Sequence, residues 1–152
     1  MKTLIVYASI HHNNTAKIAE SMAKELNADT LKAQDATPAI VAGYDIIGIG
    51  SGIYMAKFHD KILKVIEENS WEGKKVFLFS TSGIGSGKFH APVEADLIRK
   101  KAEVIGSFWC KGFDTYVKFF NLFGGLAKGH PDEKDLQAAR EFAKGIRETE
   151  GV

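Results

Sequence analysis

The chain has 152 residues, of which 45% are hydrophobic and 26% charged, and its formal net charge at pH 7 is +1. These values are typical of one globular domain with its own core, and the scattered charges argue against a nucleic-acid-binding protein. No apolar run approaches the roughly 20 residues that cross a bilayer. One cysteine, Cys110, excludes an internal disulfide. We therefore expect residues 1–152 to form a single, monomeric, cytoplasmic domain without membrane insertion.

The first predicted unit is a strand, a polar loop and a helix. Residues 1–8 are an apolar run, and residues 15–26 repeat their apolar side chains every three or four positions. The loop between them carries hydroxyl, amide and imidazole groups, and it opens at a helix N-terminus, where unpaired N–H groups and the helix dipole favour anions. It lacks the glycine fingerprint of dinucleotide sites and the Gly-Lys-Ser/Thr of nucleoside triphosphatases. This pattern predicts a loop for a phosphate monoester, such as that of flavin mononucleotide (FMN).

Strands and helices alternate along the rest of the chain. Residues 30–33 are a weak edge-strand candidate, and residues 45–50 are a strong strand that stops at a polar loop, 51–54. Residues 75–79 and 104–110 are the fourth and fifth strands, and a third polar loop spans 80–88. The helix that follows the loop 51–54 is predicted to bury Phe58, Ile62, Val65 and Ile66. The last helix is predicted to bury Leu136, Ala139, Phe142, Ala143 and Ile146.

Five strands that alternate with helices predict a parallel α/β sheet with right-handed crossovers and helices on both faces. In such sheets, ligands bind beyond the carboxyl ends of the strands, where the strand order reverses. The first, third and fourth strands each end in a loop rich in Ser, Thr, Asn and Gly. We expect these three loops to converge on one site.

The element order and the three loops resemble the flavodoxin family over essentially the whole chain. The first loop is similar to a family variant that reads Ser-x-His-His-Gly-Asn-Thr, with Asn13 in place of the glycine. Asparagine tolerates positive φ better than most residues, so the turn is expected to be kept. The run Ser51-Gly52-Ile53-Tyr54 resembles the second loop, in which an aromatic ring stacks on the flavin, and Thr81-Ser82-Gly83 resembles the start of the third.

This resemblance implies a doubly wound, flavodoxin-like sheet of five parallel strands in the order 2-1-3-4-5, with FMN as the cofactor. It implies backbone contacts from Ser82 and Gly83 to the pyrimidine edge of the flavin, and stacking by Tyr54. The residues expected to bind FMN are Ser9, Ile10, His11, His12, Asn13, Asn14, Thr15, Ser51, Gly52, Ile53, Tyr54, Thr81, Ser82 and Gly83. No residue is assigned a catalytic role.

Simpler roles compete for several of these residues. Ser9 and Thr15 are also good helix caps. His11 and His12 suggest a metal site, but no further ligand stands at suitable spacing nearby, so we expect no metal. The expected role of His11 is backbone N–H donation, and Tyr54 can instead pack on its own loop.

The function that the resemblance favours is an electron carrier between redox proteins, a donor reductase and an acceptor enzyme. A small FMN-dependent oxidoreductase that acts on a quinone or resembles protoporphyrinogen oxidases is the alternative, and a flavin-free module that only binds partners is a third. An enzyme needs an additional pocket beside the flavin, which we expect under the aromatic-rich segment 113–130. The aromatic-rich segment 113–130 either packs on the domain, covers the flavin or docks a partner.

The charges near the three loops also bear on function. The loops contain no carboxylate, and His11, His12, Lys57, Lys88 and His90 lie in them or just beyond. Positive charge stabilises a reduced, anionic flavin. We therefore expect a less negative second reduction potential than in acidic flavodoxins, and partners with acidic or neutral surfaces.

Overall fold

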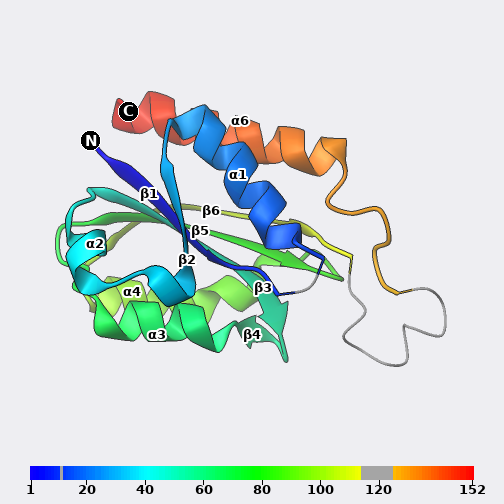
Figure 1. Ribbon diagram of the computed structural model, residues 1–152, viewed down its shortest axis with the longest axis horizontal. Helices are drawn as coiled ribbons and strands as arrows, with labels where there is room; N and C mark the ends of the chain where they lie inside the picture. The colour runs from blue at the N-terminus through cyan, green and yellow to red at the C-terminus, as the bar shows by residue number, and fades with distance from the viewer. Residues whose placement is uncertain (11, 114–124) are drawn as a thin grey trace.

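A computed structural model describes residues 1–10, 12–113 and 125–152 of the chain (Figure 1). Within these residues, five parallel strands form a sheet in the order β2-β1-β3-β5-β6, and β4 pairs with β3 in the antiparallel direction. The strands are β1 (Thr3–Ala8), β2 (Asp29–Lys32), β3 (Ile46–Tyr54), β4 (Lys57–Phe58), β5 (Lys75–Ser82) and β6 (Glu103–Lys111). Counting only the parallel strands, this is the predicted order 2-1-3-4-5.

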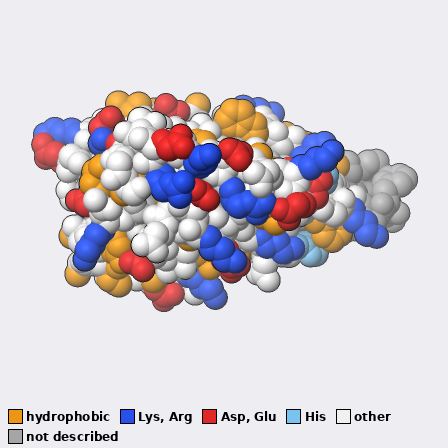
Figure 2. Space-filling view, turned by 90° about the horizontal axis from the view of Figure 1, so that it is seen from above, with side chains coloured by type: hydrophobic (Ala, Val, Ile, Leu, Met, Phe, Trp, Pro, Cys, Tyr) orange, Lys and Arg blue, Asp and Glu red, His pale blue; other side chains and the backbone are white. Residues whose placement is uncertain are grey.

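Helices cover both faces of the sheet, as predicted. Helices α1 (Asn14–Leu26) and α6 (Glu133–Glu150) lie side by side on one face, and α3 (Asp60–Glu68) and α4 (Ala91–Arg99) lie on the other (Figure 1). The connections include α2 (Pro38–Ala42) and two 3-10 turns, η1 (Ala33–Asp35) and η2 (Gly87–His90). Lys, Arg, Asp and Glu side chains are interspersed over the face that α1 and α6 form (Figure 2).

Two apolar layers hold the helices against the sheet, because successive residues of a strand point to opposite faces. Ile5 and Phe77 pack in the layer under α1 and α6, whereas Val6 and Leu78 pack in the layer over α3 and α4. The residues predicted for the inward face of the last helix all belong to the first layer or pack against it: Leu136, Ala139, Phe142, Ala143 and Ile146.

Two glycines of β3 let β5 bury large aromatic rings beside them. A Cβ added to Gly48 would lie 2.4 Å from Cζ of Phe77, and one added to Gly50 would lie 2.0 Å from Cζ of Phe79. Both rings are fully buried, so they have little room to move aside. The close packing of β3 against β5 therefore depends on the missing side chains.

The predicted boundaries of the second and third loops are wrong. Residues 51–54 are the last part of β3, and β5 continues to Ser82, because backbone pairing between the strands extends as far as Gly52 opposite Thr81. Phe58 is likewise not a helix residue: it lies in β4, which folds back on β3, and its side chain is fully buried. The small polar residues in these segments suggested loops, but backbone pairing with neighbouring strands extends β3 and β5 through them.

Residue 11 and residues 114–124 lie outside the described residues. The expectations for His11, and most of those for the segment 113–130, therefore stay predictions. Among the described residues, no helix is both long and apolar enough to cross a membrane.

A pair of glycine substitutions tests the packing of β3 on β5. Gly50→Ala should lower the free energy of unfolding by about 1–3 kcal/mol, since the new methyl group overlaps the Phe79 ring. Gly145→Ala, in the middle of α6 with open space around it, should raise this free energy by about 0.5–1 kcal/mol. Urea denaturation measures both. Equal stability of the two variants would contradict the packing argument.

Candidate functional site

The register of the sheet brings four strand ends to one level. Ala8 at the end of β1 pairs with Ser51 of β3, Gly52 pairs with Thr81 of β5, and Thr81 pairs with Cys110 of β6. The polar residues that follow these strands therefore meet at the same edge of the sheet. The three predicted loops do converge, and the end of β6 joins them.

The loop after β1 makes a tight turn into α1. His12 and Asn13 have φ values of 55° and 53°, so both adopt the left-handed conformation that was expected at Asn13. The hydroxyl of Ser9 accepts a hydrogen bond from the Ala16 N–H at 3.3 Å, and Ser9 thus serves as a cap. The first N–H groups of a helix have no partner within it, so this turn directs them, with the positive end of the helix dipole, toward the sheet edge.

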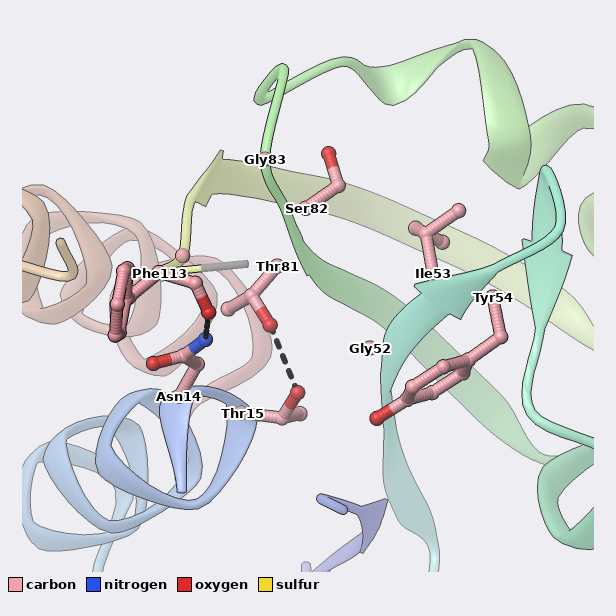
Figure 3. A pocket seen from close by; sticks show the side chains of 10 residues that line it. Asn14, Thr15, Gly52, Ile53, Tyr54, Thr81, Ser82, Gly83 and Phe113 are labelled. Carbon is pink, nitrogen blue, oxygen red and sulfur yellow. Dashed lines mark hydrogen bonds between the residues drawn. The ribbon is translucent and has the colours of Figure 1, made fainter. Parts of the chain in front are cut away.

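Thr15 links this loop to β5. Its Oγ1 lies 2.9 Å from Oγ1 of Thr81, and the two residues are only 1% and 4% exposed (Figure 3). The hydroxyl of Thr15 is therefore not a cap of α1, which was the simpler expectation. It forms a buried bridge between the first and third loops.

The residues after β6 join three parts of the site. The Phe113 carbonyl accepts a hydrogen bond from the side-chain amide of Asn14 at 2.8 Å, and the Gly112 N–H donates to the Ser82 carbonyl at 3.0 Å. The Phe113 N–H donates to the His130 carbonyl at 2.8 Å, and the rings of Phe113 and His12 are 4.4 Å apart between centroids. A Cβ on Gly112 would lie 2.8 Å from Nδ2 of Asn14, so a glycine fits this junction.

A hollow that is open to solvent lies between these strand ends (Figure 3). Tyr54 stands on one side of it, with its ring over Gly52 and its hydroxyl accepting a 3.3 Å hydrogen bond from the Ile10 N–H. The residues that line the hollow are Asn14, Thr15, Gly52, Ile53, Tyr54, Thr81, Ser82, Gly83, Gly112 and Phe113.

Eight of the predicted site residues line this hollow: Asn14, Thr15, Gly52, Ile53, Tyr54, Thr81, Ser82 and Gly83. Ser51 does not, since its buried hydroxyl donates to the Gly52 carbonyl and accepts from the His59 N–H at 2.8 Å. Ser9, Ile10, His12 and Asn13 shape the adjoining turn instead. Gly112 and Phe113 were missed as site residues, although the carboxyl end of the fifth strand had to reach the same edge.

A second hollow, of about 370 Å³ and open to solvent, lies on the other side of Tyr54. The Tyr54 and His59 rings meet edge to face, 5.2 Å apart, and the Nδ1 of His59 accepts from the Lys61 N–H at 3.1 Å. Partial burial, followed by the charge of Lys61, lowers the pKa of His59. The residues that line this hollow are Ile10, Tyr54, Met55, Lys57, Phe58, His59 and Asp60.

Two of the expected positive charges are absent or paired. His90 is only 3% exposed, its Nε2 lies 2.7 Å from Oγ of Ser80, and burial lowers its pKa to about 4. Lys57 forms an ion pair with Asp60 at 3.0 Å. The expectation that His90 acts as a cation near neutral pH is therefore wrong. The burial of His90 could not be predicted from the residues around it in the sequence, because Phe58 and Trp109, which pack on its ring, come from β4 and β6.

Neither Cys110 nor the acidic cluster beside it offers reactive chemistry. Burial raises the pKa of Cys110 to about 12, and Asp135 and Asp132 add to this rise, so the thiol keeps its proton. His130, Asp132 and Asp135 lie close enough together to ligate a metal ion. However, Asp132 and Asp135 cap α6 by exchanging hydrogen bonds of 3.0 and 2.8 Å, and His130 bonds Asp135 at 2.6 Å. These groups stabilise the start of α6.

The sequence profile of the flavodoxin domain matches residues 4–126. The chain belongs to the flavodoxin family. An uncharacterised protein of Methanocaldococcus jannaschii is 49% identical over 148 residues, which cover 96% of this chain and 98% of that protein.

Solved flavodoxins share the fold at low sequence identity. One from the domain Archaea is 19% identical, covers all of both chains and has a TM-score of 0.73. A Fusobacterium nucleatum flavodoxin bound to FMN is 14% identical, with a TM-score of 0.68 and coverage of 98% of this chain and 99% of its own. These matches confirm the predicted fold.

Protonation of His90 should change the free energy of unfolding as the pH falls. Its pKa is about 4 when folded and about 6.5 when unfolded. The unfolded chain therefore binds the proton first as the pH falls. Between these two pH values, the free energy of unfolding should decrease by about 1.4 kcal/mol for each pH unit because of this group. His90→Gln, which can still bond to Ser80 but does not titrate, should lose that slope.

Urea denaturation at several pH values between 4 and 7 measures this effect. Parallel pH profiles for the wild type and the His90→Gln variant would contradict the assignment of His90 as a buried neutral group.

Proposed function

We propose that the chain binds FMN in the hollow between Thr15, Tyr54 and Thr81 and carries electrons between redox proteins. The observation that carries this proposal is the convergence of the α1 N-terminus, three strand ends and an aromatic ring on one open hollow. The chemistry of the residues fits both ends of FMN.

The phosphate end of FMN suits the α1 N-terminus. The left-handed turn at His12 and Asn13 exposes N–H groups, and Thr15 adds a buried hydroxyl. These donors bind an anion without a buried lysine or arginine. Asn14 has a different role, because its side-chain N–H group holds the Phe113 carbonyl.

The flavin ring suits the other side of the hollow. Tyr54 offers an aromatic face above Gly52, where a side chain larger than hydrogen would meet the Tyr54 hydroxyl. Aromatic faces favour offset stacking on planar rings. Ser82 and Gly83 offer backbone groups at the edge of the hollow, where the absence of a Cβ on Gly83 allows close approach.

When bound, FMN supplies the redox chemistry, and the protein holds the flavin and controls access to it. An open hollow suits transfer between proteins, because the partner can reach the edge of the ring. Four exposed apolar side chains surround this end of the molecule: Ile10, Met55, Ile84 and Trp109. We propose that redox partners dock there, and that the carrier works in the cytoplasm, where a free thiol such as Cys110 persists.

The charge around this end favours partners with an acidic surface. Lys88 and Lys111 are exposed, and neither forms an ion pair with any described residue. The aliphatic stem of Lys111 approaches Gly85, and Trp109 approaches Gly87, so the lysines adjoin the exposed apolar side chains. Of the carboxylates at this end, Asp60 is paired with Lys57, and Asp132 and Asp135, near Cys110, exchange hydrogen bonds that cap α6.

The second hollow favours a second candidate, an FMN-dependent oxidoreductase that acts on an organic substrate. Its volume of about 370 Å³ is that of a small-molecule site, and it shares Tyr54 with the first hollow. The pocket expected for an enzyme was under the segment 113–130, whereas this hollow lies beside β4. Anaerobic reductive titration followed by addition of a quinone separates the candidates. Rapid, saturable quinone reduction favours the enzyme, whereas slow, unsaturable reduction favours the carrier.

Two variants test the orientation of FMN. Thr15→Val should weaken FMN binding by about 1.5–3 kcal/mol through loss of a hydroxyl bond to a charged group, and should leave riboflavin binding unchanged. Tyr54→Leu should weaken the binding of both flavins by about 0.5–1.5 kcal/mol. Flavin fluorescence titrations give the four affinities. If the wild type binds neither flavin, the proposed function is wrong; if Thr15→Val weakens both equally, the orientation is wrong.

Small redox reagents test the sign of the docking charge. At low ionic strength, Lys111→Glu should slow reoxidation of the reduced FMN complex by ferricyanide, an anion, at least about threefold. It should speed reoxidation by hexaamminecobalt(III), a cation. Lys24→Glu, at the far end of α1, is the matched control and should change neither rate. Stopped-flow absorbance measures both. Equal effects of the two substitutions would contradict a basic docking surface.

A further inference from the structure

We propose that Thr81 is a positioning residue that makes the site selective for the phosphorylated flavin. Its hydroxyl donates a hydrogen bond to Oγ1 of Thr15, and this leaves the proton of Thr15 free for the phosphate. This inference rests on the proposed function. It gives Thr81 a role in orienting Thr15, in addition to the contact with FMN that the sequence predicted.

The geometry restricts how the two hydroxyls can bond. Their oxygens are 2.9 Å apart, and within the described part of the chain each hydroxyl has the other as its hydrogen-bond partner. A hydroxyl donates one proton and accepts up to two. In the ligand-free protein, either threonine can therefore be the donor.

An anion at the α1 N-terminus removes this freedom. A fully ionised phosphate monoester only accepts hydrogen bonds, so Thr15 contacts it favourably only by donating its single proton. Thr15 must then accept from Thr81, and the order becomes Thr81 to Thr15 to phosphate. Without the Thr81 hydroxyl, Thr15 still donates, but its oxygen has a lone pair that no protein group satisfies.

Because both threonines are buried, the order of the hydrogen bonds from Thr81 to Thr15 to the phosphate affects affinity. Thr15 is 1% and Thr81 is 4% exposed, so water does not readily replace a missing partner. An unmade hydrogen bond costs more in such a place, and chained hydroxyl bonds strengthen one another. Riboflavin has no phosphate, so Thr15 can then donate to any acceptor or remain as in the free protein. The Thr81 hydroxyl should therefore favour FMN over riboflavin.

The same bond joins the two ends of the site. Thr15 belongs to the first turn of α1, and Thr81 directly precedes Ser82 and Gly83, the residues proposed for the flavin edge. Thr81 also pairs with Gly52, over which Tyr54 stands. A phosphate that orients Thr15 thus also holds the strand end that supports the ring.

The test compares FMN and riboflavin affinities of substituted proteins by fluorescence titration. Thr81→Val removes the hydroxyl while keeping the shape, and should weaken FMN binding between about threefold and tenfold but riboflavin binding less than about twofold. Thr81→Ser should restore the wild-type FMN affinity. In the double variant Thr15→Val/Thr81→Val, FMN should bind as in Thr15→Val alone, because Thr81 acts only through Thr15.

Thr3→Val is the matched control. Thr3 is a buried threonine on β1 whose hydroxyl has no hydrogen-bond partner among the described residues, and it lies at the opposite end of the sheet from the site. Its substitution should change neither affinity. If Thr81→Val does not fold cooperatively, Thr81→Ala makes the same comparison without the added methyl group.

Three outcomes would overturn the proposal while FMN binding by the wild type still stands. The first is an unchanged FMN affinity in Thr81→Val, and the second is an equal loss of affinity for FMN and riboflavin in that variant. The third is a loss of FMN affinity in the double variant that equals the product of the losses in the two single variants. Failure of the wild type to bind either flavin would instead overturn the proposed function, and this inference with it.

Discussion

The parallel register of β1, β3, β5 and β6 is the constraint on which the rest of the structure depends. It places Ala8 beside Ser51, Gly52 beside Thr81, and Thr81 beside Cys110. A shift of one residue would turn each strand's apolar set to the opposite face and would misalign the strand ends. The glycines of β3 help to maintain this register, because the buried aromatic rings of β5 fit only beside them.

The site derives its polarity from neutral groups that satisfy one another. Thr15 and Thr81 bond across the first and third loops, and Ser80 bonds to His90 behind them. Because His90 is neutral and Lys57 is paired, fewer positive charges than expected surround the hollow. In the proposed function, the phosphate would therefore be held mainly by the α1 N-terminus and by hydroxyl donors.

Tyr54 occupies the position that separates the two candidate functions. It stands between the hollow at the strand ends and the larger hollow beside β4, and its hydroxyl reaches the backbone of Ile10. A carrier needs only the first hollow and an accessible ring edge. An enzyme would use both hollows, with Tyr54 and His59 as the shared wall. The short β3–β4 hairpin therefore matters for function, because it positions Tyr54 between the two hollows.

The sequence by itself determined the alternating elements, the strand order, the flavodoxin family and most of the residues around the hollow. The alternating elements and the convergence of polar strand ends follow from local patterns, namely apolar periodicity, turn residues such as Asn13 and polar residues after strands. The strand order and the flavin-binding residues came from the resemblance of the sequence to the flavodoxin family. Only the tertiary structure decided that residues 51–54 are strand, that Phe58 lies in β4, that Gly112 and Phe113 join the site, and that His90 is buried. The position of Phe58 depends on a hairpin with Ile53, five residues before it, and the other features depend on partners distant in the chain. Strand pairing and burial by neighbouring strands leave no periodic signal in the segment itself.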